Sequence, residues 1–345
     1  MSSFPSLSIV IPSYNQGAYI ERTLLSILKQ DYPGEVEVIV SDGGSKDETV
    51  EVLKKYPQVK WWSQRDEGFV DAVTKGFAVA KGEILAIQSS DDFYLKDAFK
   101  KSIKELIQED SLSIVAGCDV YMQPDRKTFS VSDLDSHLIT PHSLLVGRVI
   151  PQHCAFFRRG VLEKVNGLRR EVDTCADIDF WYRALHFFKG KFIPHYTAAY
   201  QYHANQRTQV LDTWYSSLVR TVETCEADHF YAERFRFTDD DKKNLYVRWE
   251  VQFGLKQADR DQLMQKMNDI MKSPNYTEET KQYVYQVGLS KEIFKGKTRS
   301  ERVLTSILDG SFPTKAIKKI EKLTTSPPKV NSGNTSIDID WWKHH

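Results

Sequence analysis

The sequence predicts an α/β fold, in which a mainly parallel sheet is flanked by helices and followed by a helical C-terminal region. Early in the chain, short apolar runs alternate with segments whose apolar residues recur every three or four positions. Parallel strands need crossover connections of this kind, usually helices. Each apolar run also ends in polar residues, as strands do where an open α/β sheet binds its ligand.

Four strands and three helices are expected before residue 93. The strands are the apolar runs at residues 8–12, 36–40, 59–62 and 84–87. The helices have amphipathic spacing and lie at residues 20–28, 50–53 and 70–80. Ser45 and Glu48 have the spacing of a capping box, which predicts that the second helix begins there. This order favours right-handed crossovers within one sheet.

The alternation becomes less regular after residue 93. Helices are expected at residues 98–106, 161–165 and 177–188, and strands at 113–116, 155–157 and 192–203. The pattern changes to long polar helices beyond about residue 210, and residues 324–340 have the composition of a flexible tail. We therefore expect a first domain at 1–210, a helical C-terminal region at 211–323 and a tail at 324–345.

The composition bears on the binding partners and the cellular compartment of the protein. Lys+Arg and Asp+Glu both count 47, so no basic field favours nucleic acid. The four cysteines form no CxxC pair, which predicts free thiols in a reducing compartment. Neither a signal peptide nor a run of about 20 apolar residues is evident. A cytoplasmic location is therefore expected.

The C-terminal region offers one feature that points to a membrane. Residues 291–330 contain ten basic residues against four acidic ones. A basic helix of this kind can rest on anionic lipid, which would place the protein peripherally on the inner face of the membrane. A solvated helix explains the same pattern. The oligomeric state is left open by the sequence.

Two adjacent acids, Asp91 and Asp92, follow the fourth predicted strand. Paired carboxylates in a dry site repel each other unless a cation is bound, so a divalent metal carrying a phosphate ligand is one interpretation. A helix N-cap at Asp92 is the other. Polar loops at residues 12–15, 42–45 and 64–68 follow the other three strands. All four loops should meet at the carboxyl edge of one sheet, which favours a binding site there.

These segments resemble the family-two glycosyltransferases of GT-A fold. The resemblance is carried by residues 9–15, 41–49, 66–68, 75–76 and 82–94, and it extends over residues 7–207. It implies a nucleotide-sugar donor, Mn²⁺ or Mg²⁺, and inverting transfer to a hydroxyl of a glycan or lipid-linked acceptor. A UDP-sugar is favoured because the small pocket between Tyr14 and Asp42 suits a pyrimidine; GDP and dTDP remain open.

The resemblance also implies a set of donor-binding residues. They are Pro12, Ser13, Tyr14, Asn15, Asp42, Gly43, Asp66, Lys75, Ser90 and Asp91. Tyr14 would lie against the nucleobase and Asp42 would accept a hydrogen bond from it. Gly43 permits close backbone approach, and Lys75 would reach the ribose or a phosphate. A core tyrosine, a turn aspartate and a solvated lysine are the ordinary structural explanations.

The family pattern assigns further roles near the metal and the acceptor. Asp92 would coordinate the metal directly, with Asp91 on the ribose or a metal-bound water. His203 would touch the metal or the diphosphate, and Arg207 a phosphate. His153 and Asp179 would bind the acceptor or the diphosphate.

Inverting transfer also needs a general base for the acceptor hydroxyl. Asp177 aligns with the base of the family. Ala176 stands where a glutamate is common, so Asp179 and Asp173 remain alternatives. Acids at the start of a helix are also stabilised by its dipole, which is a purely structural explanation.

Two other functions fit parts of this pattern. A sugar nucleotidyltransferase should carry a glycine-rich loop with a basic residue after the first strand, and residues 12–17 contain no basic residue. A non-catalytic nucleotide-sugar-binding protein has no need of a base, so the retained Asp177 argues against it.

Overall fold

The computed structural model describes residues 4–122, 129–131, 138–141, 149–203, 206, 211–228, 238–254, 260–278 and 280–284. The strands are β1 (Leu7–Ser13), β2 (Val36–Asp42), β3 (Lys60–Ser63), β4 (Ile84–Ile87), β5 (Phe93–Tyr94), β6 (Leu112–Met122), β7 (Phe129–Val131), β8 (Leu138–Ile139), β9 (Ala155–Arg158) and β10 (Lys189–Gln201). The α-helices are α1 (Ile20–Leu28), α2 (Thr49–Leu53), α3 (Phe69–Val79), α4 (Ala98–Gln108), α6 (Arg159–Val165), α7 (Ala176–Leu185), α8 (Leu211–Ala227), α10 (Asp239–Gly254) and α11 (Arg260–Lys272). Two 3₁₀ turns are η1 (Gln152–Cys154) and η2 (Arg170–Cys175).

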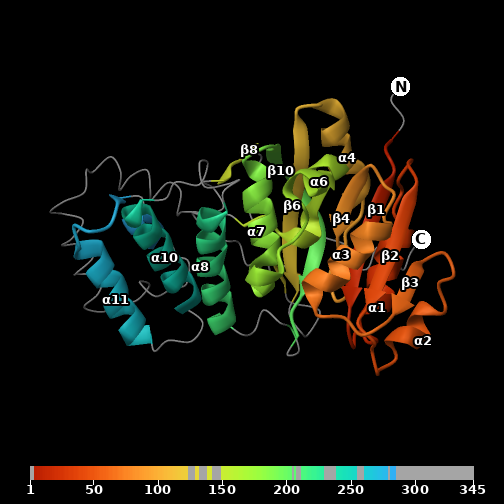
Figure 1. The fold of residues 1–345 in the computed structure, drawn as a ribbon, viewed down its shortest axis with the longest axis horizontal. Coiled ribbons are helices and arrows are strands. Elements are labelled where there is room, and N and C mark those ends of the chain that lie inside the picture. The colour runs from red at the N-terminus through yellow and green to blue at the C-terminus, as the bar shows by residue number, and fades with distance from the viewer. Residues whose placement is uncertain are drawn as a thin grey trace.

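One mixed sheet organises the first two hundred residues, with the strand order β3-β2-β1-β4-β9-β6-β10-β5 (Figure 1). Strands β1 to β4 run parallel, as the sequence predicted. Strand β9 lies between β4 and β6 and runs antiparallel to both. Strands β6 and β10 are parallel to each other. The sheet is therefore parallel in its first half and mixed in its second. Its carboxyl edge collects the ends of β1, β2, β4, β6 and β10.

Two hydrophobic layers cover the two faces of the sheet, because alternate residues of each strand point to opposite sides. Val10 of β1 packs with α3, α6 and α7, while its neighbours Ile9 and Ile11 pack with α1, α2 and α4. Helix α3 lies close to β1 at Gly76, where an added Cβ would come within 2.3 Å of Val10 Cγ1. The glycine of the Lys75-Gly76 motif therefore serves helix–sheet packing.

One local prediction was wrong, and one structural alternative is excluded. The capping box at Ser45 does not form: α2 begins at Thr49, and Ser45 Oγ instead contacts the Asp42 carboxylate at 2.5 Å. Asp92 is not a helix cap either, because the next two residues form β5 and the helix begins at Ala98. In both places a residue distant in the sequence also holds the side chain: Asn15 N donates to Ser45 Oγ at 2.7 Å, and Gln201 N donates to Asp92 Oδ1 at 3.0 Å.

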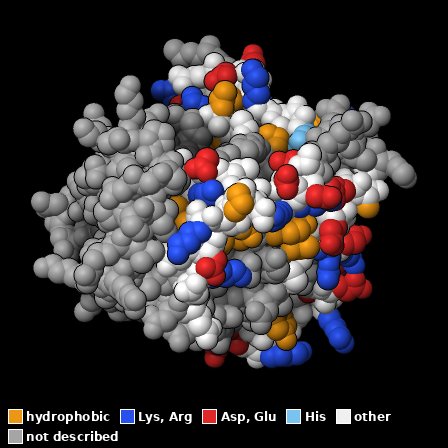
Figure 2. All heavy atoms as spheres, turned by 90° about the vertical axis from the view of Figure 1, so that its left-hand side faces the viewer, with side chains coloured by type: hydrophobic (Ala, Val, Ile, Leu, Met, Phe, Trp, Pro, Cys, Tyr) orange, Lys and Arg blue, Asp and Glu red, His pale blue; other side chains and the backbone are white. Residues whose placement is uncertain are grey.

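The C-terminal helices extend away from the sheet in the order α7, α8, α10, α11 (Figure 1). Met267, Ile270 and Met271 are buried on α11. The described part of this end of the molecule shows acidic and basic side chains interspersed around hydrophobic ones (Figure 2). Within the described chain, no helix is both long and apolar enough to span a bilayer. The basic segment at 291–330 and the tail lie outside the described residues.

Candidate active site

The loop after β2 is built around Asp42, which is fully buried. Its Oδ2 accepts hydrogen bonds from the backbone N–H groups of Gly44 and Ser45 at 3.1 and 2.9 Å. Ser63 Oγ donates to the same oxygen at 2.6 Å, and Ser45 Oγ lies 2.5 Å from Oδ1. A carboxylate offers about four acceptor positions, so these contacts occupy most of them. We interpret Asp42 as the residue that shapes this loop; its contact with a nucleobase stays a prediction.

The loop after β1 lies beside it. Tyr14 is 58% exposed, which is unusual for a large aromatic ring and leaves its face open to a ligand. Asn15 adopts a left-handed conformation (φ 54°), and its N–H donates to Ser45 Oγ at 2.7 Å. Ser13 O accepts from Gly43 N at 2.8 Å. The loops that carry the predicted base-binding residues are therefore joined to each other.

Asp66 reaches the same loop from the end of β3. An added Cβ on Gly43 would lie 2.8 Å from Asp66 Oδ2, so the missing side chain makes room for this acid. Lys75 instead pairs with Asp71 one helical turn away, at 2.6 Å, and its contact with a donor stays a prediction. Arg170 also binds Asp71, at 2.6 Å. Because α3 begins at the carboxyl edge, Arg170 holds η2 against that edge.

Asp91 and His203 meet beyond the ends of β4 and β10. His203 Nε2 lies 2.9 Å from Asp91 Oδ2. The imidazole also stacks on the ring of Tyr19, with centroids 4.5 Å apart and an interplanar angle of 17°. Ser90, just before Asp91, is buried, and its carbonyl lies 2.9 Å from Thr23 Oγ. Thr23 of α1 therefore supports the acidic turn, and Tyr19, just before this helix, supports the histidine.

Asp92 is 1% exposed and lies beside the same turn. Its Oδ1 accepts from Gln201 N at 3.0 Å. Burial raises the pKa of this carboxyl well above its usual value, and the charge of Asp91 adds to the effect. A bound cation would reverse both effects, so this pair of acids has the electrostatic character of a cation site.

His153 connects Asp92 to a further acid that the sequence analysis missed, Asp119 of β6. His153 Nδ1 lies 3.9 Å from Asp92 Oδ2, and Nε2 lies 3.8 Å from Asp119 Oδ2. Burial lowers the pKa of the imidazole, although Asp119 and Asp91 oppose this. The sequence carried one signal for Asp119, because it is a single acidic residue between Cys118 and Val120 in an otherwise apolar strand.

Tyr200 of β10 lies beside this histidine and contacts two further tyrosines, Tyr121 of β6 and Tyr202 just after β10. Tyr200 lies 5.8 Å from the His153 ring, 5.9 Å from Tyr121 and 5.1 Å from Tyr202. Tyr121 donates a hydrogen bond to Asp119. This cluster was not predicted, because β6 extends to Met122, well beyond the strand expected at residues 113–116. The tyrosines give the far end of the site aromatic walls.

The side-chain oxygen and nitrogen atoms at this edge are chemically suited to bind a divalent metal. Within the described ranges no three His, Cys, Asp or Glu side chains converge on one point. Asp91 and His203 do meet and Asp92 is adjacent, and carboxylate oxygens suit Mn²⁺ and Mg²⁺. The Nδ1 atom of His203 is buried without a hydrogen-bond partner among the described residues. Arg207 lies outside those residues.

Asp177 lies in the first turn of α7, on a different element. Burial raises the pKa of its carboxyl to about 6, and the charge of Asp179 adds to this. Helix α7 packs on the sheet through Trp181, whose ring centroid lies 5.3 Å from that of Phe157 in β9. Because Arg170 holds η2 at the carboxyl edge, the start of α7 faces that edge too.

Asp179 has a different environment. It is fully buried and paired with Arg183, whose Nε lies 2.8 Å from Asp179 Oδ2. An acceptor cannot reach a carboxylate in this position without breaking the pair. We therefore interpret Asp179 as an anchor of α7 rather than as an acceptor ligand or the base. The backbone of Asp173 lies in η2, and its side chain is not described.

Parts of this sequence are similar to known proteins. Residues 8–165 match the model of glycosyl transferase family 2. An uncharacterized glycosyltransferase of Mycobacterium tuberculosis (strain H37Rv) is 31% identical over 193 residues, which are 53% of this chain and 70% of the relative. A chondroitin synthase of Escherichia coli is 27% identical over 181 residues, which are 51% of this chain but 26% of that longer protein.

Solved structures share the fold. S. aureus TarS (residues 1–349), in complex with UDP-GlcNAc, gives a TM-score of 0.56 at 15% identity and covers 88% of each chain. Mannosyltransferase PcManGT from Pyrobaculum calidifontis, in complex with GDP-Man and Mn²⁺, gives 0.53 at 16% identity, with 92% of this chain and 84% of that chain covered. These likenesses confirm the predicted GT-A fold. The chain belongs to glycosyltransferase family 2 and is a glycosyltransferase.

Proposed function

We propose that this enzyme transfers a sugar from a nucleotide diphosphate to a hydroxyl of a glycan or lipid-linked acceptor, with metal assistance and with inversion at the anomeric carbon. The observation that carries this proposal is the contact between Asp91 and His203 beside buried Asp92, at the carboxyl edge of the sheet. The Arg170–Asp71 pair holds the turn before Asp177 near the same edge. UDP is the favoured nucleotide, and GDP is the first alternative.

The donor half of the site would use the loops after β1 and β2. Tyr14 offers an exposed ring on which a base can stack. Asp42 keeps the neighbouring loop in one conformation, and Gly43 and Asp66 form its closely packed floor. A rigid loop lowers the entropic cost of donor binding.

Asp91, Asp92 and His203 would hold a Mn²⁺ or Mg²⁺ ion. When bound, the ion would offset the charge that develops on the departing nucleotide diphosphate. The three side chains come from two strand ends that the sheet fixes, so their geometry is set by the scaffold. His153, held between Asp92 and Asp119 in its neutral form, can donate or accept a hydrogen bond on the acceptor side.

Asp177 would take the proton of the acceptor hydroxyl. A pKa near 6 leaves this carboxylate ionised at neutral pH yet more basic than an ordinary aspartate, which favours proton transfer. Inversion follows if the hydroxyl attacks the anomeric carbon from the face opposite the diphosphate. Asp177 and the metal pair lie on separate elements, which suits two groups that act on opposite sides of one sugar.

Structural neighbours support a nucleotide-sugar donor, since TarS is seen with UDP-GlcNAc and PcManGT with GDP-Man and Mn²⁺. We also propose a cytoplasmic location, supported by four buried cysteines that form no disulfide with one another.

A two-stage experiment tests the function. Thermal shifts would be measured with UDP-glucose, UDP-GlcNAc and GDP-mannose, each with Mn²⁺, Mg²⁺ or EDTA, because a ligand that binds only the native state raises its melting temperature. The best donor would then be followed for release of its nucleotide, with water as the acceptor. We expect metal-dependent release that Asp177→Asn slows and Asp92→Asn abolishes. Binding without release, in both the presence and absence of metal, would contradict a catalytic role.

A further inference from the structure

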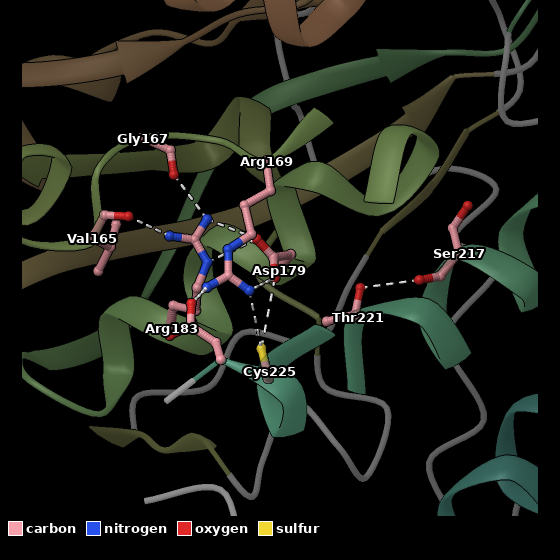
Figure 3. A network of polar contacts seen from close by, with 9 residues as sticks. Val165, Gly167, Arg169, Asp179, Arg183, Ser217, Thr221 and Cys225 are labelled. Atoms are coloured by element: carbon pink, nitrogen blue, oxygen red, sulfur yellow. Dashed lines mark hydrogen bonds and ion pairs between the residues drawn. The ribbon is translucent and has the colours of Figure 1, made fainter. Parts of the chain in front are cut away.

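A buried ion-pair network joins the helix of the proposed base to the C-terminal region. Asp179 and Arg183 are both fully buried. Arg183 Nη2 lies 2.7 Å from Asp179 Oδ2, and its guanidinium also donates to the Val165 and Gly167 carbonyls, at 2.5 and 2.8 Å (Figure 3). The pair therefore ties α7 to the end of α6.

The second oxygen of Asp179 faces helix α8. Cys225 Sγ lies 3.7 Å from Asp179 Oδ1, and Arg169 Nη1 lies 3.9 Å from the same oxygen (Figure 3). Burial raises the pKa of the Cys225 thiol to about 12, so it is a neutral S–H that can donate to the carboxylate. Arg169 also pairs with Asp228, just after α8. One carboxylate thus contacts α7, α8 and the segment before η2.

The position of Asp179 relative to Asp177 gives this network its significance. Residues two positions apart point to different sides of a helix, so the buried anchor leaves Asp177 directed elsewhere. Taking a buried charge out of its pair is strongly destabilising, which makes the anchor hard to displace. The groups that face Asp179 are Arg183 from its own helix, Arg169 from the segment before η2 and Cys225 from α8.

We propose that Arg169 and Cys225 are positioning residues, through which helix α8 of the C-terminal region fixes the first turn of α7 and so the orientation of Asp177. This inference rests on the proposed role of Asp177 as the base. It makes the C-terminal helices part of the catalytic apparatus rather than an independent appendage. Arg169 has a second effect, because its positive charge offsets that of Asp179, which otherwise acts on Asp177.

The test uses Arg169→Gln in the full chain, with Arg159→Gln as the matched control. Arg159 is also half-buried and donates to backbone carbonyls, at Gly82 and Ala80, but these lie before β4 and not on α7. Nucleotide release from the best donor would be measured as kcat, KM and pH profile. Arg169→Gln should lower kcat by roughly tenfold with KM unchanged, since small misplacements of catalytic groups are costly. It should also move the acid limb of the profile to higher pH, and Arg169→Lys should restore that limb.

A second pair of variants covers the case in which Arg169→Gln fails to fold. Cys225→Ser keeps a donor toward Asp179 Oδ1 and should retain activity, whereas Cys225→Ala should lower kcat. Three results would overturn the inference. Arg169→Gln could keep the kcat and the acid limb of the wild type, or Arg159→Gln could show the same effects as Arg169→Gln. The two Cys225 variants could also be equally active. Asp177→Asn separates it from the proposed function: wild-type release in that variant would refute the base itself, whatever Arg169 does.

Discussion

His203 Nε2 lies 2.9 Å from Asp91 Oδ2, although the residues are 112 positions apart in the chain. The contact joins the end of β4 to the end of β10, which are separated in the sheet by β9 and β6. An imidazole held against a carboxylate at a strand end is a common arrangement around bound metals, where one group orients the other. The pair therefore marks where the donor diphosphate and its metal are expected.

Replacing His203 should weaken metal binding without destroying the chemistry. In His203→Gln we expect the Mn²⁺ concentration for half-maximal nucleotide release to rise by about 10–100-fold, the usual effect of losing such a group. kcat at saturating Mn²⁺ should stay within a few-fold of wild type. Tyr19→Phe keeps the ring that stacks on the imidazole and serves as the control. An unchanged Mn²⁺ requirement in His203→Gln would remove this histidine from the metal site.

Asp92→Asn should separate activity from stability. Loss of a metal ligand should slow nucleotide release by roughly 10³-fold, because a catalytic metal supplies several kcal/mol of transition-state stabilisation. The metal-free protein should melt at the same or a higher temperature, because the substitution removes a buried charge next to Asp91. The melting temperature in EDTA tests the prediction on stability, and the rate of nucleotide release in Mn²⁺ tests the prediction on activity. Collapse of the fold in EDTA would instead assign Asp92 a structural role.

Tyr14 offers a test of the nucleobase site. Tyr14→Ala should raise KM for the donor roughly five- to 150-fold, since aromatic stacking of a base contributes about 1–3 kcal/mol. Tyr14→Phe keeps the ring and should bind the donor normally. Leu138→Ala is a matched control, because Leu138 is 57% exposed, much like Tyr14. If Tyr14→Ala and Leu138→Ala gave the same KM as wild type, the base would have to lie elsewhere.

The anchor of α7 makes a stability prediction. Arg183→Met leaves the Asp179 carboxylate buried and poorly paired, and the free energy of unfolding should fall by about 3–5 kcal/mol. Adding Asp179→Leu should recover much of the loss, because two apolar groups can replace a buried pair. Denaturant titration measures both variants. A smaller loss in Arg183→Met than in the double variant would show that the pair does not stabilise α7.

The sequence predicted the regular elements well because apolar periodicity is local. The strands around Ile9 and Ile39 and the helices around Leu24 and Phe99 lie where the spacing of apolar residues predicted them. The edge of the sheet on which the polar loops meet also followed, since parallel strands end on one edge. The glycosyltransferase family was likewise evident from an ordered set of short motifs.

The unpredicted features depend on partners that lie far away in the chain. Ser45 and Asp92 both match local helix caps, yet each accepts a hydrogen bond from a residue distant in the sequence, Asn15 and Gln201 respectively. Asp179 sits in a motif that suggested acceptor chemistry, but Cys225 and Arg169 complete its environment from other elements. Asp119 reaches the site because β6 is longer than its apolar core indicates. No local pattern encodes such pairings.

The role of Asp177 is tested most directly by the pH dependence of kcat/KM for nucleotide release. Burial raises the pKa of this carboxyl to about 6, and only the ionised form can accept a proton. The rate should therefore fall about tenfold per unit as the pH drops below that value. Asp177→Asn should lose at least 10²-fold in rate, the usual contribution of a general base, and should lack this limb while still binding the donor. The same raised pKa means that the ionised carboxylate costs stability as the pH rises from about 4 to about 6. An Asp177→Asn enzyme that kept both the wild-type rate and the acid limb near pH 6 would contradict the account.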